Sequence, residues 1–213
     1  VLHQAFKEAG LQTENHPKSK ALDDWSKIDA IAVTHTPGLL GSLLVGTLTA
    51  RTLAILHHKP LYAVHHLKSH IYANWLTEKP EFPLLALVIS GGHTQIIHMS
   101  AHNHFEIIAS TRDDAVGECF DKIAKILGLP YPGGPEIDRL ARAGDPQAID
   151  FPRALAQEGN YEFSFSGLKS AVLNYINGQR MKGRELHAAD IAASFQAAVT
   201  EVLVHKAFEA IHA

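Results

Sequence analysis

The chain has 213 residues, of which 46% are hydrophobic and 19% are charged, a composition typical of a folded globular protein with one large domain or two small ones. Its formal net charge of −3 at pH 7 excludes a general electrostatic attraction to nucleic acid, so such a partner would need a local basic patch or another molecule. The single cysteine, Cys119, excludes an internal disulfide, and the lack of a signal peptide and of any long apolar run predicts a cytoplasmic protein without a membrane span.

The first third of the chain alternates predicted strands and helices. The β-branched apolar run 28–34 predicts a strand, and after a loop of proline and glycine the residues 43–58 repeat apolar side chains at helical spacing. A second strand at 59–66 and a second helix at 67–76 follow. Residues 77–83 carry two prolines among charged residues and predict a linker between two lobes.

The rest of the chain begins with strands and ends with helices. Apolar runs at 84–90, 94–100 and 105–111 are joined by short turns and predict an antiparallel meander. An amphipathic helix with a buried Cys119 is expected at 113–129, followed by a helix that a glycine loop and Pro135 open. Residues 162–176 predict a short strand that leads into a helix, and residues 189–211 predict a long final helix. Helical patterns reach both ends without caps, so we expect part of a longer protein.

Two pairs of histidines stand four residues apart, and about one such pair is expected by chance from 15 histidines in 213 residues. His66 and His70 follow a predicted strand, so they fall in the first turns of a helix, share one face and tend to be neutral, which is the metal-binding form. His98 and His102 fall on a strand and a turn, where this spacing gives no common face. No carboxylate stands between His66 and His70, so the pattern of zinc proteases is missing.

Three glycine loops follow strands or open helices, at 37–41, 90–93 and 132–135. Glycine in such loops lets backbone N–H groups approach an anion, although ordinary tight turns use glycine as well. None of the three fits the P-loop pattern with its lysine, and the dinucleotide-binding pattern GxGxxG is absent. The loops are therefore candidates for a nucleotide site of another type.

Carboxylates gather in the predicted helix 113–129, where Asp113, Asp114, Glu118 and Asp121 fit either a solvated acidic face or, for Asp121, a hydrogen bond to a sugar hydroxyl. Asp138, at the start of the next predicted helix, fits the same two interpretations. Lys169 follows the turn before the helix at 166 and is expected to contact a phosphate or to be solvated.

Four segments, taken in this order and at these distances, resemble the TsaD-type tRNA threonylcarbamoyladenosine transferases, a glycoprotease-like family. The segments are AVHHLKSHIYA, LALVISGGHTQI, DDAVGECFDKIAKILGLPYPGGPEID and FSFSGLKSAV. The resemblance spans nearly the whole chain. It implies an α/β fold of the actin/Hsp70-like type (ASKHA, ribonuclease H-like), incomplete at both termini, with residues 1–80 in the first lobe and 81–213 forming most of the second.

The resemblance also implies a reaction and a site. Members transfer a threonylcarbamoyl group from threonylcarbamoyl-AMP to the adenosine adjacent to the tRNA anticodon, on its 3′ side. Matched residue by residue, the metal ligands are His66 and His70. The matched substrate-binding residues are Val88, Ile89, Ser90, Gly91, Gly92, Asp121, Gly134 and Asp138. No catalytic residue is assigned.

The cofactor implied by the resemblance is one divalent metal ion, iron or zinc, with magnesium as an option beside the nucleotide. The implied partners are tRNA, threonylcarbamoyl-AMP or an ATP-like nucleotide, a paralogous ASKHA protein and a small ATPase of the same pathway, all in the cytoplasm and without a membrane. One departure concerns the metal site, because Lys68 and Ser69 replace the usual Glu-Gly pair and a lysine there adds repulsion unless it points away.

A second departure is that the amino-terminal hairpin and the carboxy-terminal segment, with an Asn contact and an Asp as third metal ligand, are missing, so we expect the chain alone to be a poor enzyme. Two other functions remain open. One is a related carbamoyltransferase that acts on a small molecule or a protein, which the acidic balance favours. The other is a non-catalytic ASKHA scaffold paralogue, against which the glycine loops and the histidines argue.

Overall fold

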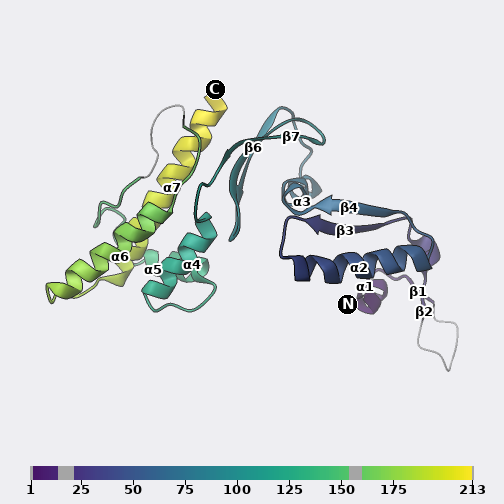
Figure 1. Cartoon of the computed structure of the whole chain (residues 1–213), viewed down its shortest axis with the longest axis horizontal. Helices are drawn as coiled ribbons and strands as arrows, with labels where there is room; N and C mark the ends of the chain where they lie inside the picture. The colour runs from purple at the N-terminus through teal and green to yellow at the C-terminus, as the bar shows by residue number, and fades with distance from the viewer. Residues whose placement is uncertain (1, 14–21, 154–159, 213) are drawn as a thin grey trace. The chain divides into compact units, whose positions relative to one another are not determined.

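The computed structural model describes residues 2–13, 22–153 and 160–212 (Figure 1). The chain divides into two compact units, which we call unit 1 (Val1–Lys79) and unit 2 (Pro80–Ala213). Both units mix helices and strands, so the chain is an α/β protein. Among the described residues, no helix is both long and apolar enough to cross a membrane.

Unit 1 is built around one βαβ crossover. Its elements in chain order are α1 (Leu2–Glu8), β1 (Gln12–Thr13), β2 (Leu22–Asp23), η1 (Trp25–Lys27), β3 (Ile31–Thr36), α2 (Leu40–Leu56), β4 (Leu61–His65), α3 (His66–Ala73) and η2 (Asn74–Leu76). Strands β3 and β4 pair in parallel, with Ile31 opposite Leu61, and α2 makes the connection that parallel neighbours require. The predicted alternation of strands and helices in this part of the chain is confirmed.

Two helix boundaries in unit 1 differ from the sequence prediction. Helix α2 starts at Leu40, so Gly41, which we expected in the preceding loop, lies in its first turn. Helix α3 ends before Asn74, whose side chain donates hydrogen bonds to the carbonyl oxygens of His70 and Ile71 at 3.3 and 3.1 Å. These side-chain bonds compete with further helical bonds, and the chain tightens into the 3₁₀ turn η2 instead of continuing as one helix.

Unit 1 has a small apolar core. Among its described residues, the buried apolar side chains are Phe6, Ala50, Ala54, Leu67 and Ile71. Helix α2, in contrast, leaves Leu44, Val45 and Leu48 exposed by 44%, 72% and 58%. Helices that cross between parallel strands usually bury such a face, so α2 presents an uncovered apolar surface within this unit.

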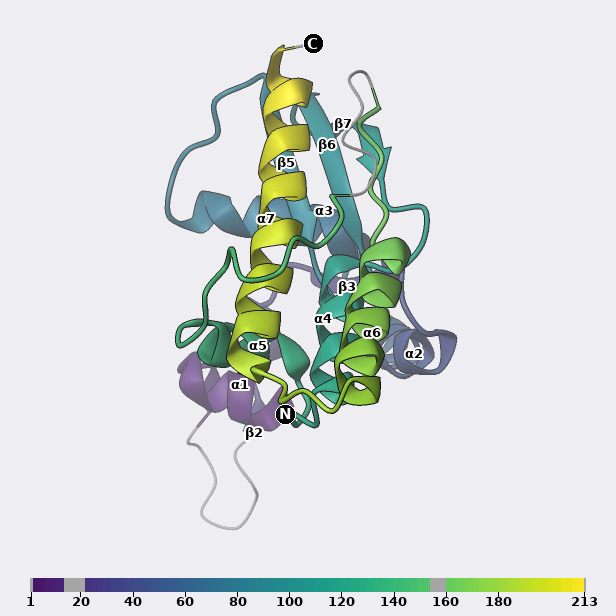
Figure 2. The same cartoon turned by 90° about the vertical axis from the view of Figure 1, so that its left-hand side faces the viewer.

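Unit 2 is an antiparallel sheet followed by helices. Its elements are β5 (Leu84–Ile89), β6 (Thr94–Ala101), β7 (His104–Ser110), α4 (Val116–Ile126), α5 (Gly133–Ala141), α6 (Ser166–Met181) and α7 (Ala188–His212). The strands lie in the order β5-β6-β7 with antiparallel pairing, so the predicted meander is confirmed. In Figure 2 the long helix α7 runs the length of the unit, with α5 and α6 beside it.

The larger hydrophobic core lies in unit 2, between its helices and the sheet. Its most deeply buried side chains include Ile123, Phe163, Phe165, Val172, Phe195 and Val199, each exposed by 1% or less. The rings of Phe120 and Phe195 meet edge to face, with centroids 4.9 Å apart, and join α4 to α7. Cys119 is fully buried on α4, as predicted.

A pairing of two distant segments attaches α6 to the end of the sheet. Thr111 and Phe163 form a parallel bridge, the Arg112 N–H donates to the Phe163 carbonyl at 2.9 Å, and the Phe163 N–H donates to the Ser110 carbonyl at 3.1 Å. The strand predicted before α6 is thus reduced to one bridge, because after Phe163 the backbone turns into the helix at Ser166.

A close approach of α4 and α5 makes Gly133 structurally necessary. A Cβ atom at this position would lie 2.6 Å from the Ala124 Cβ, 2.7 Å from the Asp121 Cα and 2.9 Å from the Phe120 carbonyl oxygen. Two of these atoms belong to backbone, so the helices would have to separate. Glycine at position 133 is therefore required by packing between two helices.

We predict that Gly133→Ala lowers the free energy of unfolding by about 1 to 3 kcal/mol, the usual cost of overpacking. Gly178→Ala is the matched control, because Gly178 lies in α6 and a Cβ there would meet no described atom within 4 Å. There alanine should leave stability unchanged or raise it by up to about 1 kcal/mol. Urea unfolding measures both, and equal effects of the two substitutions would contradict the assignment.

Candidate functional site

The loop Ser90–His93 joins β5 to β6 and is closed by its own serine. The Ser90 N–H donates to the His93 carbonyl at 2.8 Å, while the Ser90 hydroxyl oxygen accepts from the N–H groups of His93 at 2.9 Å and Gly92 at 3.3 Å. Before the loop, Val88 is buried and Ile89 is 46% exposed at the end of β5. The predicted substrate loop is thus a rigid turn at a strand end.

Neither glycine of this loop is explained by the fold of the described residues. Gly91 and Gly92 do not have the positive φ that would require glycine, and a Cβ at either position would meet no described atom within 4 Å. An ordinary hairpin turn uses glycine for its φ angle. That explanation does not apply here, and the glycines leave open space in front of the loop.

Gly117 holds the loop against the first turn of α4, and the sequence reasoning missed it. A Cβ on Gly117 would lie 2.8 Å from the Gly91 Cα and N atoms, and the Gly117 N–H donates to the Ser90 carbonyl at 3.1 Å. The fully buried Thr94 accepts from the Val116 N–H at 2.9 Å and so caps the same turn. The available signal was a glycine in a strong amphipathic helix, where alanine is favoured by about 1 kcal/mol.

Asp121 lies one turn after Gly117 on the same face of α4. Its Oδ1 accepts the Gly133 N–H at 2.7 Å, so this carboxylate caps the start of α5. Asp121 also borders a hollow of about 300 Å³ that Lys122 and Tyr131 help to line. Gly134, in the first turn of α5, has no described atom within 4 Å of a Cβ position, so it presents an open surface.

Asp138 lies in the middle of α5, whereas the sequence placed it at the start of a helix. Its Oδ2 accepts from the Arg142 guanidinium at 2.8 Å, and its Oδ1 accepts from the Gln196 amide of α7 at 3.3 Å. The Arg142 bond first, and then the Gln196 bond, lower the pKa of Asp138 below its usual value. Asp138 is therefore an ionised carboxylate at the contact of α5 with α7.

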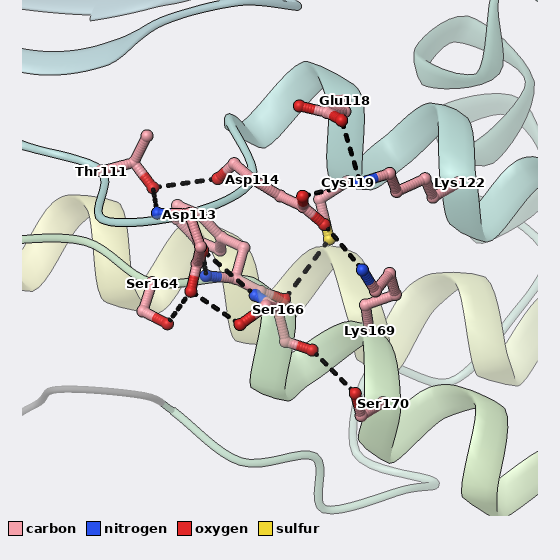
Figure 3. Close-up of polar contacts among 11 residues, drawn as sticks. Thr111, Asp113, Asp114, Glu118, Cys119, Lys122, Ser164, Ser166, Lys169 and Ser170 are labelled. Carbon is pink, nitrogen blue, oxygen red and sulfur yellow. Dashed lines mark hydrogen bonds and ion pairs between the residues drawn. The ribbon is translucent and has the colours of Figure 1, made fainter.

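The prediction of one acidic helix face at Asp113, Asp114, Glu118 and Asp121 is wrong. Helix α4 begins at Val116, so the first two carboxylates precede it, and only Glu118 lies in the first turn. Figure 3 shows the two aspartates turned toward α6 and α4, each among polar partners. The pattern misled because a bend with Asp residues and the first turn of a helix have the same composition.

Asp113 binds the start of α6. Its carboxylate accepts hydrogen bonds from the Ser164 hydroxyl at 2.5 Å, the Ser166 hydroxyl at 2.7 Å, and the N–H groups of Phe165 and Ser166 at 2.8 and 3.2 Å. Partial burial would raise the pKa of Asp113, but the bonds from the two hydroxyls and the backbone outweigh it and lower the pKa. A carboxylate about 50 residues away thus caps this helix (Figure 3).

Asp114 joins α4 to α6 through two lysines. Its Oδ1 accepts from Lys122 at 2.6 Å and its Oδ2 accepts from Lys169 at 3.0 Å. Lys169 was expected to contact a phosphate or to be solvated, and the structure gives it this carboxylate partner instead. Burial raises the pKa of the adjacent Cys119 thiol to about 12, so this cysteine is an unreactive core side chain.

In unit 1, His66 and His70 lie on one exposed face of α3, as predicted. Their Nε2 atoms are 3.2 Å apart. A metal ion roughly 2.0–2.1 Å from each nitrogen would give an N–metal–N angle of about 100°, close to tetrahedral, so the pair fits a metal ion. The described residues hold no cluster of three or more His, Cys, Asp or Glu side chains, so the other ligands would come from outside them.

The unusual Lys68 lies off this face. Residues two positions away point to the opposite side of a helix, so Lys68 is turned from the two imidazoles. Ser69 donates its hydroxyl hydrogen to the carbonyl of His65, the residue before α3, at 3.1 Å. The repulsion expected between a lysine and an ion held by this pair would therefore be reduced by distance.

Comparison with known proteins links these features to one family. Residues 18–213 match the family model described as TsaD, tRNA N6-adenosine threonylcarbamoyltransferase. The chain is 58% identical over 210 residues to the tRNA N6-adenosine threonylcarbamoyltransferase of Anoxybacillus flavithermus, and 51% identical over 210 residues to that of Geobacillus kaustophilus.

A relative with the same name from Bacillus cereus is 51% identical over 213 residues. These three alignments cover 99% or 100% of this chain but only 58% of each relative. The chain therefore spans a little over half the length of the curated relatives that it matches.

We predict that Asp113→Asn lowers the free energy of unfolding at pH 7 by about 1 to 2 kcal/mol, because a neutral amide accepts these bonds less strongly. The folded-state pKa of Asp113 is lowered from 3.8, so its contribution is complete above about pH 4 and is lost as pH falls through the lower folded value. Urea unfolding between pH 2 and pH 7 should show the difference between wild type and variant shrinking below about pH 4.

The matched control is Asp150→Asn, at an exposed ion pair with Arg153, which should cost less than about 1 kcal/mol. A difference between wild type and Asp113→Asn that stays constant down to pH 2 would refute the assigned role.

Proposed function

Because the chain belongs to the TsaD family of tRNA N6-adenosine threonylcarbamoyltransferases, we propose that the whole protein transfers a threonylcarbamoyl group from threonylcarbamoyl-AMP to the adenosine beside the tRNA anticodon, on its 3′ side. The observation that carries this proposal is the match of residues 18–213 to the family model. The open glycine loop of unit 2 supports it, since the described fold gives no other reason for these glycines.

The reaction is an acyl transfer. The N6 amino group of the adenosine attacks the carbamoyl carbon, the bond from that carbon to the phosphate oxygen breaks, AMP leaves with the electron pair, and the amine loses a proton. Charge develops on the carbamoyl oxygen, so the site needs fixed hydrogen-bond donors there. The N–H groups of the loop Ser90–Gly92 are our candidates for these donors or for the phosphate site.

The other substrate-binding residues that we propose lie at the end of β5, on α4 and on α5. Val88 and Ile89 end the strand that carries the loop, and Gly134 presents open surface at the start of α5. We assign the sugar of the nucleotide to the carboxylates Asp121 and Asp138. Both are already hydrogen-bonded within the chain, which holds them in position before a ligand arrives.

His66 and His70 would hold one divalent metal ion, iron or zinc, both of which suit imidazole ligands. Such an ion would polarise an oxygen of the substrate and help to orient it. The 3.2 Å separation of the two Nε2 atoms supports this assignment. Magnesium beside the nucleotide is compatible with it, because magnesium binds mainly phosphate oxygens and water.

We further propose the actin/Hsp70-like ASKHA fold for the whole protein, with residues 1–80 in the first lobe and 81–213 in the second. The βαβ crossover of unit 1 and the meander followed by helices in unit 2 are compatible with these lobes. The proposed partners are tRNA, a paralogous ASKHA protein and a small ATPase, in the cytoplasm. The net charge of −3 gives tRNA little general attraction, which favours help from such partners.

A related carbamoyltransferase that acts on a small molecule or a protein is the second candidate, and the same acidic charge favours it. It predicts carbamoyl transfer without tRNA. Activity of the full-length protein with threonylcarbamoyl-AMP and with or without tRNA separates the two functions. A non-catalytic scaffold would show no transfer under either condition.

We predict that the full-length protein loses one equivalent of iron or zinc in a His66→Ala/His70→Ala variant, because both imidazoles are direct ligands. His98→Ala/His102→Ala is the matched control, since that pair lies on a strand and a turn and should leave the metal content unchanged. Elemental analysis of the purified proteins gives the stoichiometry. The metal assignment is wrong if the first double variant retains as much metal as wild type.

We predict that Gly92→Val in the full-length protein weakens ATP binding by about ten- to several-hundredfold, as expected from the loss of one or two hydrogen bonds to a charged group. The melting temperature should change little, because a Cβ at this position meets no described atom within 4 Å. Gly178→Val, in α6, should change neither quantity and is the control. Calorimetric titration and thermal unfolding test this, and a lower melting temperature with unchanged affinity would make Gly92 a purely structural residue.

A further inference from the structure

The turn between α6 and α7, which we call the basic turn (residues 179–186), carries an excess of positive charge. It contains Arg180, Lys182 and Arg184 but only one carboxylate, Glu185, so its net charge is +2 in a chain whose net charge is −3. All three basic residues are exposed. Positive charge is thus concentrated at one point of the surface, although the chain as a whole is acidic.

The charges of the basic turn are not neutralised within the described residues. Most lysines and arginines of unit 2 form ion pairs with carboxylates, namely Arg112, Lys122, Arg139, Arg142, Arg153 and Lys169. The side chains of Arg180, Lys182 and Arg184 form no hydrogen bond or ion pair with any described residue, a property that they share with Lys125 on α4. Three neighbouring cations are therefore available to an anionic partner.

The backbone of the basic turn is fixed by a helix-ending motif. Gly183 has a φ of +64°, and its N–H donates to the Arg180 carbonyl at 3.0 Å. The Arg184 N–H donates to the Gln179 carbonyl, also at 3.0 Å. These are the two hydrogen bonds of a Schellman motif. A partner that binds here therefore does not have to order the backbone first.

The end of α6 explains only part of this charge. The last turn of a helix favours cations, because its free carbonyl groups carry partial negative charge. Arg180 lies in that last turn, but α6 ends at Met181 and Arg184 follows three residues later. The effect of the helix end falls off beyond the last turn, so it does not account for the whole run.

The basic turn lies at the end of unit 2 where α5 meets the start of α7. The Asp145 N–H, just after α5, donates to the Asp190 carboxylate in the first turn of α7 at 2.9 Å. Figure 2 shows the turn between α6 and α7 at the same end of the unit as α5. From Ala188, the first residue of α7, to Gln196, the partner of Asp138, the helix rises by roughly 12 Å. A nucleic-acid strand carries a phosphate about every 3.4 Å of helix axis, so a few nucleotides cover this length.

We propose that Arg180, Lys182 and Arg184 form a docking surface for the phosphate backbone of the tRNA substrate. The inference rests on the proposed function, which brings this polyanion to the chain. Basic side chains bind a phosphate backbone through charge and without reading sequence, so the surface adds affinity and positions the RNA but does not select the target base. An acidic chain needs such a local basic surface to bind RNA.

The test measures tRNA binding to the full-length protein as a function of salt concentration. Arg180→Gln/Lys182→Gln/Arg184→Gln removes three charges and keeps polar side chains. Each phosphate contact contributes about 0.7 to 0.9 to the slope of log affinity against log salt, so the slope should become shallower by about 2 to 3. The same slope corresponds to an affinity loss of about a hundredfold at 0.1 M salt and almost none at 1 M.

The matched control is Lys7→Gln/Lys27→Gln/Lys79→Gln, which removes the same charge from exposed lysines of unit 1 and should weaken tRNA binding by less than about threefold. ATP affinity and the urea midpoint should equal those of wild type in both variants, because neither set of side chains belongs to the proposed nucleotide site or to the core.

Three results would overturn the inference: unchanged tRNA affinity in the variant of the basic turn, equal losses in both variants, which indicate an effect of net charge alone, or no tRNA binding by the wild-type protein. In each case the proposed function still stands if wild-type protein with its partners transfers the threonylcarbamoyl group to tRNA. The proposed function itself fails if that transfer does not occur.

Discussion

The architecture of unit 2 depends on the attachment of Ser110–Asp114 to the segment that enters α6. Three consecutive residues form this attachment. Arg112 contributes a backbone hydrogen bond and an ion pair to Glu162. Asp113 accepts four hydrogen bonds, and Asp114 forms an ion pair with Lys169. Because Asp114 also binds Lys122, the same short turn orients α4. Sheet, α4 and α6 thus share one polar junction, and the proposed site lies on the α4 face that this junction holds in place.

Glycine has two distinct roles along this face. Gly117 and Gly133 are required by close backbone approach, since a Cβ at either position would meet atoms at 2.9 Å or less. Gly91, Gly92 and Gly134 have open space instead, and a ligand is our explanation for them. In the glycine loop at 132–135, Gly133 is required by helix packing, whereas Gly134 leaves open space that a ligand could occupy. The motif alone does not distinguish them, because both roles require the same residue.

The order and type of most elements could be predicted from the sequence, because strand alternation and helical spacing are local properties. The meander, α4 with its buried Cys119, and the placement of His66 and His70 on one helix face were found in this way. The partners of Asp113 and Lys169 could not be found, since they lie about 50 residues away and leave no periodic signal. The hydrogen bond from Gln196 to Asp138 was missed for the same reason, because it joins two helices 58 residues apart in the chain.

The junction also bears on how unit 2 folds. The meander and the α4–α5 pair use contacts between neighbouring segments, which form quickly because little chain entropy is lost in closing them. Thr111 and Phe163 must instead meet across about 50 intervening residues. By this measure their bridge forms later than the local contacts of the meander. The packing of Phe120 against Phe195 closes a still longer loop, so both contacts should form after the meander, and Asp113 acts among these late contacts rather than in the sheet that precedes them.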